Sequence, residues 1–64
     1  MPLVEISISQ GHTDEKLREL MQGVHDAVEK WGAPSSSIRV LVREIPPALW
    51  RAGGTTLAEQ RRGK

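Results

Sequence analysis

The order of three patterned segments is the feature of this chain that most restricts its fold. Residues 3–9 alternate between apolar and polar, with apolar side chains at Val4, Ile6 and Ile8. Residues 38–45 alternate in the same way, with Ile38, Val40 and Val42 on one face. This period of two is typical of half-buried strands. A helical segment lies between the two strands, which predicts a β-α-β unit with parallel strands and a right-handed crossover.

The helical segment has clear signals at both ends. Thr13 can cap the first turn, and the acidic residues that follow it are favoured there by the helix dipole. Apolar residues then recur every three or four positions, at Leu17, Leu20, Met21, Val24, Ala27, Val28 and Trp31. Gly32 suits the C-terminal cap, and Pro34 prevents continuation. We expect this stripe, including Trp31, to pack in the core, and Ser35-Ser36-Ser37 to form a turn or one helical turn.

The last third of the chain contains turn-forming residues. Pro46-Pro47 ends the second strand, and Gly53-Gly54 favours a loop leading to a short hairpin before residue 58. Residues 58–64 contain Arg61-Arg62 and are expected to be a frayed basic tail. The whole chain, 1–64, is therefore predicted to be a single α+β domain.

A chain of 64 residues leaves little margin of stability, because it buries only about 60% of its unfolded surface. It contains no cysteine for disulfides or thiolate metal sites, and its two histidines are far apart. One helix can cover only one face of the predicted sheet, and the other face carries Leu3, Leu41 and Ile45. These features favour oligomerisation.

The charge balance indicates which partners to expect. Nine basic and eight acidic residues give a net charge of +1, which argues against nucleic acid and anionic membranes as partners. The sequence shows neither a membrane span nor a signal peptide, so a cytoplasmic location is expected.

Pro2 is the first candidate for chemistry. Initiator methionine is generally removed before proline, which would leave a secondary amine held by a strand. A site that destabilises the protonated amine, through burial or nearby arginines, would make it a base at neutral pH. Alternatively, Pro2 only starts an edge strand.

Several residues together resemble one family, 4-oxalocrotonate tautomerase (2-hydroxymuconate tautomerase), of the tautomerase superfamily. The resemblance rests on an N-terminal proline on a strand, Gly11, Ala33-Pro34, Ile38-Arg39-Val40, Glu44, Pro46-Pro47, Trp50 and Gly53-Gly54. It implies a homohexamer, a trimer of dimers, with active sites shared between chains. It also implies proton transfer in an unsaturated carboxylic acid such as 2-hydroxymuconate, with no cofactor and no metal.

The resemblance also assigns roles to residues. Pro2 would be the general base, and Arg39 of a neighbouring subunit would hold the carboxylate and carbonyl end of the substrate. Trp50 would form an apolar wall, although ordinary packing is an alternative. His12 stands where the family usually has an arginine for a second carboxylate. Either His12 still binds that carboxylate, or Arg43 or Arg51 replaces the missing cation, or the substrate has one carboxylate. For His12 itself, a place in the loop without any role is favoured slightly over a substrate contact.

Other functions remain open from the sequence. A hydratase or dehalogenase would need a carboxylate to position water, for which Glu5, Glu44 and Asp14 are candidates. A catalytically silent family member is a further alternative. A non-enzymatic oligomeric module of the ribbon-helix-helix type would need a second long helix after Pro34. His25 is expected at the surface and not as a ligand.

Overall fold

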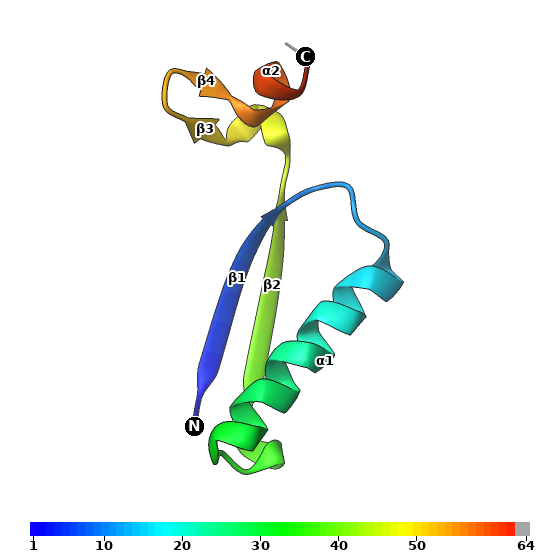
Figure 1. Ribbon diagram of the computed structural model, residues 1–64, viewed down its shortest axis with the longest axis vertical. Coiled ribbons are helices and arrows are strands. Elements are labelled where there is room, and N and C mark those ends of the chain that lie inside the picture. The colour runs from blue at the N-terminus through cyan, green and yellow to red at the C-terminus, as the bar shows by residue number, and fades with distance from the viewer. Residues whose placement is uncertain (63–64) are drawn as a thin grey trace.

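The computed structural model of the protein describes residues 1–62 and contains the predicted β-α-β unit. Strand β1 (Leu3–Ser9) leads into helix α1 (Asp14–Trp31), and strand β2 (Arg39–Ile45) returns beside β1 (Figure 1). The two strands are parallel and in register from the pair Leu3 and Arg39 to the pair Ser9 and Ile45. A short antiparallel hairpin, β3 (Arg51–Ala52) and β4 (Thr55–Thr56), follows. The predicted fold class is confirmed.

Both ends of α1 form as the sequence predicts. The Thr13 hydroxyl accepts a hydrogen bond from the Lys16 N–H at 3.1 Å, which satisfies one free donor of the first turn. Gly32 ends the helix with φ +138°, a conformation that side chains rarely adopt, and its N–H donates to the carbonyls of Val28 and Glu29. The turn at Ser35–Ser37 is a 3₁₀ turn, η1, and a second one, η2 (Pro47–Leu49), follows β2.

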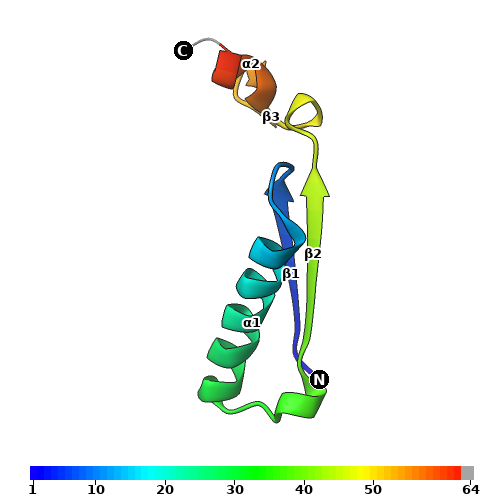
Figure 2. The ribbon, with the colours of Figure 1, turned by 90° about the vertical axis from the view of Figure 1, so that its right-hand side faces the viewer.

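Helix α1 covers one face of the two-stranded sheet and leaves the other face open (Figure 2). Ala33 and Ile38 are the buried residues of the described chain, at 8% and 6% exposure. Trp31 is 83% exposed, so its predicted place in the core is wrong. The backbone reverses at Gly32, immediately after Trp31, and this reversal buries Ala33 in its place.

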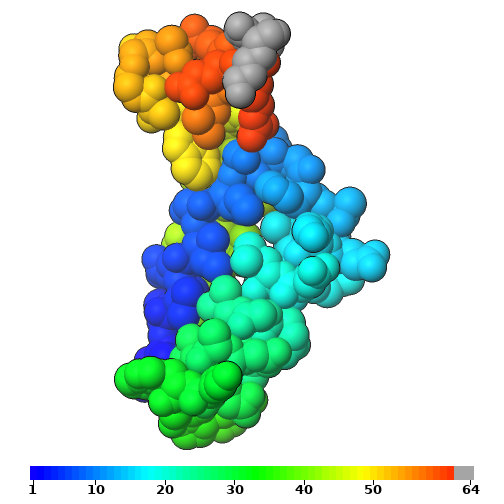
Figure 3. All heavy atoms as spheres, viewed as in Figure 1, coloured from blue at the N-terminus to red at the C-terminus, as the bar shows by residue number. Residues whose placement is uncertain are grey.

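The single chain is elongated, measuring 44 × 24 × 15 Å. Its radius of gyration is 15.0 Å, whereas a compact globular chain of this length has about 11 Å. The hairpin and the final helix form a lobe at one end of the molecule (Figure 3). On the open face of the sheet, Leu3 and Leu41 are 54% and 48% exposed. A shape with so little buried surface favours association with other chains.

The C-terminal segment is more ordered than expected. Residues Leu57–Arg62 form helix α2, so the prediction of a frayed tail is wrong for residues 58–62, and residues 63–64 lie outside the described residues. The cause is a capping box: the Thr56 hydroxyl accepts from the Glu59 N–H at 3.2 Å, and the Glu59 carboxylate accepts from the Thr56 N–H at 3.2 Å.

The structure of the chain after Pro34 bears on the alternative of a ribbon-helix-helix module. Over residues 35–62 it forms 3₁₀ turns, strands and the six-residue helix α2. A second long helix, which a ribbon-helix-helix repressor requires, is not among these elements. Within the described residues, moreover, no helix has the length and apolar character needed to span a membrane.

Candidate active site

Pro2 lies directly before β1 and is fixed by the sheet. Its carbonyl accepts a hydrogen bond from the Arg39 N–H at 3.0 Å, which extends the parallel ladder by one step. The proline is half-buried, whereas the side chain of Met1 is 87% exposed and projects from the fold. While Met1 is attached, the proline nitrogen is an amide without basicity. Removal of Met1 would expose a held secondary amine and cost almost no packing.

Arg39 lies at the same end of the sheet, and its guanidinium is held by backbone carbonyls. Nη1 donates to the carbonyl of Ser36 at 2.9 Å and to that of Ile38 at 3.1 Å. A guanidinium has five N–H donors, so the Nε and Nη2 donors stay available for a carboxylate. Alternation along the strands places Arg39 on the open face of the sheet and Pro2 on the face covered by α1. One chain therefore does not direct these two side chains toward each other.

His12, Trp50 and Arg51 lie beyond the opposite ends of the strands. Strand β1 alone separates Pro2 from this region by about 23 Å over its seven residues. Arg51 donates from Nη2 to the carbonyl of Gly54 at 2.8 Å, within its own hairpin. Trp50 follows η2, is half-buried, and its carbonyl accepts from the Leu57 N–H at 2.8 Å. The structure thus brings Pro2 near Arg39, but brings neither of them near the other candidates.

Arg43 forms an ion pair with Glu5 across the open face of the sheet, with 3.5 Å between Nη2 and Oε2. Both side chains are about half exposed, so the pair stabilises the fold by at most about 1 kcal/mol. Because Arg43 lies on the open face, it does not face the region around His12 in the same chain.

Glu44 ties the loop after β1 to the sheet. Its Oε2 atom accepts from the N–H groups of Gly11 at 3.3 Å and His12 at 3.4 Å. Gly11 has φ +125°, which a side chain would disfavour, so glycine lets the loop present both donors. The role of Glu44 was not predicted, although the sequence holds a signal: it is a carboxylate on the apolar face of its strand.

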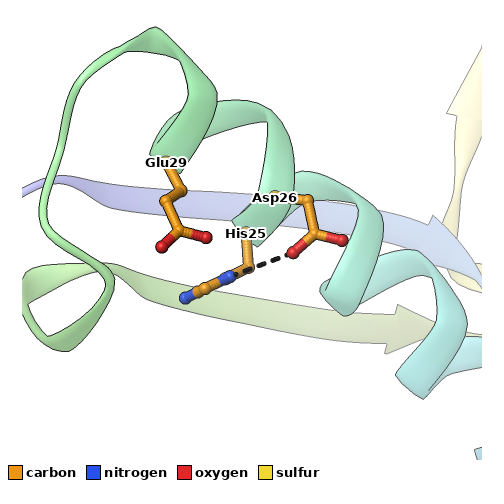
Figure 4. A group of neighbouring side chains, drawn as sticks. All are labelled: His25, Asp26 and Glu29. Carbon is orange, nitrogen blue, oxygen red and sulfur yellow. Dashed lines mark hydrogen bonds and ion pairs between the residues drawn. The ribbon is translucent and has the colours of Figure 1, made fainter.

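The described residues include one group that could coordinate a metal ion: His25, Asp26 and Glu29 on α1, whose ligand atoms lie within 4.8 Å of one another (Figure 4). Two of these groups, His25 and Asp26, already have partners within the chain. The ring of His25 contacts the Ser35 hydroxyl at 3.0 Å and the Asp26 carboxylate at 3.4 Å. His25 is half-buried and not fully at the surface, because it links α1 to η1. The expectation that no metal is needed stays a prediction.

Comparison with known proteins adds evidence independent of this geometry. The sequence model of the family described as "Tautomerase enzyme" matches residues 2–60. A probable tautomerase of Staphylococcus aureus is 36% identical over 61 residues, which cover 94% of this chain and 100% of that protein.

Several solved structures are similar to this chain over most of its length, including the following two. One is TomN, a 4-oxalocrotonate tautomerase homologue of the tomaymycin biosynthetic pathway, with a TM-score of 0.90, 32% identity and 95% of each chain covered. The other is a heterohexameric 4-oxalocrotonate tautomerase from Chloroflexus aurantiacus, with a TM-score of 0.85 and 30% identity. That match covers 92% of this chain and 97% of the other.

Proposed function

The chain belongs to the tautomerase family, and we propose that it is a cofactor-independent tautomerase with the amine of Pro2 as its general base. Its proposed substrate is 2-hydroxymuconate or a related enol acid. Pro2 takes the proton of the 2-hydroxyl group, the electrons shift along the conjugated system, and the proton returns to a distant carbon. The product is the conjugated 2-oxo acid. One proton leaves oxygen and one arrives at carbon, so the step needs no electron acceptor.

The fixed position of Pro2 is the observation that carries this proposal. A general base must be held at one point relative to the substrate, and the hydrogen bond from the Arg39 N–H fixes this residue at the sheet. An ordinary α-amino group has a pKa of about 7.7–8.0, and the amine of proline is more basic. Partial burial and nearby guanidinium groups would lower the pKa of the freed amine toward neutrality.

Arg39 is proposed to hold the carboxylate and the 2-oxygen of the substrate. Its two hydrogen bonds to Ser36 and Ile38 preorganise the guanidinium before the substrate arrives. The remaining donors can form a bidentate contact with a carboxylate and stabilise the negative charge that develops on the enolate oxygen.

The separation of the candidates within one chain is explained by a site shared between chains. Strand β1 has a free edge, and two copies related by a two-fold axis pair such edges in antiparallel fashion. This pairing would place Pro2 of one copy beside the His12 end of β1 in the other. The two helices would then lie on the same face of the joined sheet, as would both prolines.

Arg39 starts from the other face, so we propose that it reaches the site from a further chain. Exposed Leu3 and Leu41 give that face the apolar surface needed for a second contact. Two kinds of contact, through the edge of β1 and through the open face, are what a homohexamer built as a trimer of dimers requires. The similar protein from Chloroflexus aurantiacus is a heterohexamer.

Trp50 is proposed to form an apolar wall of the shared site, where a low dielectric would keep the amine unprotonated. For hydration or dehalogenation, the chain would need a free carboxylate that positions water. Glu5 is paired with Arg43, and Glu44 is bound to the loop at Gly11 and His12, so two of the three candidates already have partners. We therefore favour tautomerisation.

The test is a kinetic assay on protein whose N-terminus has been checked by mass. Wild type should convert 2-hydroxymuconate or a related dienol acid to the conjugated ketone. Pro2→Ala and Arg39→Ala should each lower kcat/KM at least about 100-fold, the lower end of the range for general acid–base contributions. If both variants retain the wild-type kcat/KM, neither residue has the proposed role.

A further inference from the structure

A groove lies where the end of β1 meets the start of α1, next to His12. It has a volume of about 270 Å³ and is lined by Ile8, His12, Lys16, Leu17, Glu19 and Leu20. Three of these six residues are apolar. By strand alternation, Ile8 lies on the same face of the sheet as Pro2. In the two-fold pairing proposed above, the groove would therefore lie on the side of the sheet that carries Pro2 of the second copy.

The charges around this groove do not favour a second anion. The N–H groups of Gly11 and His12, which a substrate carboxylate could use, already donate to the chain's own Glu44 carboxylate. Lys16 brings one positive charge, but Glu19 also lines the groove, with 3.8 Å between Nζ and Oε1. A second carboxylate here would meet Glu19, and Lys16, the cation among the described residues that line the groove, already has the Glu19 carboxylate beside it.

The two arginines that could replace the family arginine do not line the groove in this chain. Arg43 pairs with Glu5 on the other face of the sheet, and Arg51 binds the Gly54 carbonyl in the hairpin. The histidine itself is shorter than arginine and has no bidentate fork.

We propose that the substrate has a single carboxylate, bound by Arg39, and an apolar far end that occupies the groove beside His12. This inference rests on the proposed function and narrows it, because it selects monocarboxylic enol acids over 2-hydroxymuconate. An apolar end gains from contact with Ile8, Leu17 and Leu20, whereas an ionised end would lose hydration and would share the charge of Lys16 with Glu19.

The experiment compares two acids that differ only at the far end. One is 2-hydroxymuconate, and the other is 2-hydroxyhexa-2,4-dienoate, which has a methyl group in place of the second carboxylate. For wild type, kcat/KM should be higher for the methyl compound. Because the two acids also differ in intrinsic reactivity, the decisive quantity is how the ratio of their kcat/KM values changes between variants.

His12→Arg should restore the missing cation and raise the ratio of dicarboxylate to methyl compound about tenfold or more, as one charge-assisted hydrogen bond allows. Since His12 is exposed in a loop, the substitution should not disturb folding. Glu29→Gln is the matched control: it changes the net charge by the same amount on an exposed part of α1 outside the groove, and should leave the ratio unchanged.

Two results would overturn the inference. The first is a wild-type preference for the dicarboxylate that Lys16→Ala abolishes, because Lys16 would then be the replacing cation. The second is an unchanged ratio in His12→Arg, which would place the far end of the substrate away from His12. Failure of wild type to convert either acid would instead contradict the proposed tautomerase function, so the two failures are distinguishable.

Discussion

Replacing Arg39 by lysine keeps the positive charge and removes the planar fork. In the structure, Nη1 is occupied by the carbonyls of Ser36 and Ile38, while Nε and Nη2 remain for the substrate. An ammonium group cannot keep both contacts with the backbone and also give two parallel hydrogen bonds to a carboxylate. We therefore expect Arg39→Lys to bind the substrate with one charged hydrogen bond fewer, and with a less fixed side chain.

The expected loss of kcat/KM follows from the loss of one charged hydrogen bond to the substrate. A hydrogen bond to a charged group contributes about 1.5–3 kcal/mol. Because about 1.4 kcal/mol corresponds to a factor of ten, Arg39→Lys should lower kcat/KM about 10- to 150-fold. Arg39→Ala removes both hydrogen bonds and the charge, so its kcat/KM should be lower than that of the lysine variant.

The assay is steady-state conversion of a dienol acid, followed by the absorbance of the conjugated product. Arg18→Lys is the control, because it makes the same chemical change at an exposed position of α1 and should leave kcat/KM within about twofold of wild type. Equal kcat/KM for Arg39→Lys and wild type would show that the fork is not used. An equal loss in Arg18→Lys would show that any arginine on this protein has the same effect, and the assigned role would be refuted.

Three further predictions concern stability, assembly and metals. Thr13→Ala should lower the free energy of unfolding by about 1 kcal/mol in denaturant titrations at fixed protein concentration, because the Lys16 N–H loses its partner; unchanged stability would show that water replaces the cap. Leu41→Glu should reduce both the oligomer mass in analytical ultracentrifugation and the activity, since a charge would be buried in the proposed contact through the open face of the sheet. A hexamer that stays intact would show that the open face is not part of the interface. Treatment with a chelator should leave kcat/KM unchanged, because the proposed step uses only an amine and a guanidinium; loss of activity restored by a divalent ion would point instead to His25, Asp26 and Glu29.

The β-α-β unit could be predicted from the sequence because its signals are local. Alternation in 3–9 and 38–45 and the cap at Thr13 depend on neighbouring residues only, and the structure confirms them. Trp31 shows the limit of such periodicity. It continues the apolar stripe of α1, but the reversal at Gly32 buries Ala33 and leaves the tryptophan exposed.

The C-terminal helix shows a different kind of error. Basic composition suggested a frayed tail, although Thr56-Leu57-Ala58-Glu59 has the spacing of a capping box. The structure shows that this pair of reciprocal hydrogen bonds starts α2. A local capping motif was a better guide here than charge.

The candidate site could be predicted only in part. Pro2 and Arg39 are adjacent through the sheet, and the pairing register that joins them follows from the two strands. The contact between Glu44 and the loop at Gly11 and His12 joins residues far apart in sequence, which no local pattern specifies. In the proposed shared site a second chain spans the distance between Pro2 and His12, and no pattern within the sequence of one chain describes such a contact.

The central claim is that the amine of Pro2 acts as the general base, and the identity of the N-terminal residue decides it. The intact mass of the protein should be measured on the same preparation whose kcat/KM is determined. The proposed mechanism predicts that active protein is lighter by one methionine residue, with Pro2 as its first residue. A fully active preparation that retains Met1 would contradict it, because the nitrogen of Pro2 would then be an amide and could not act as the base.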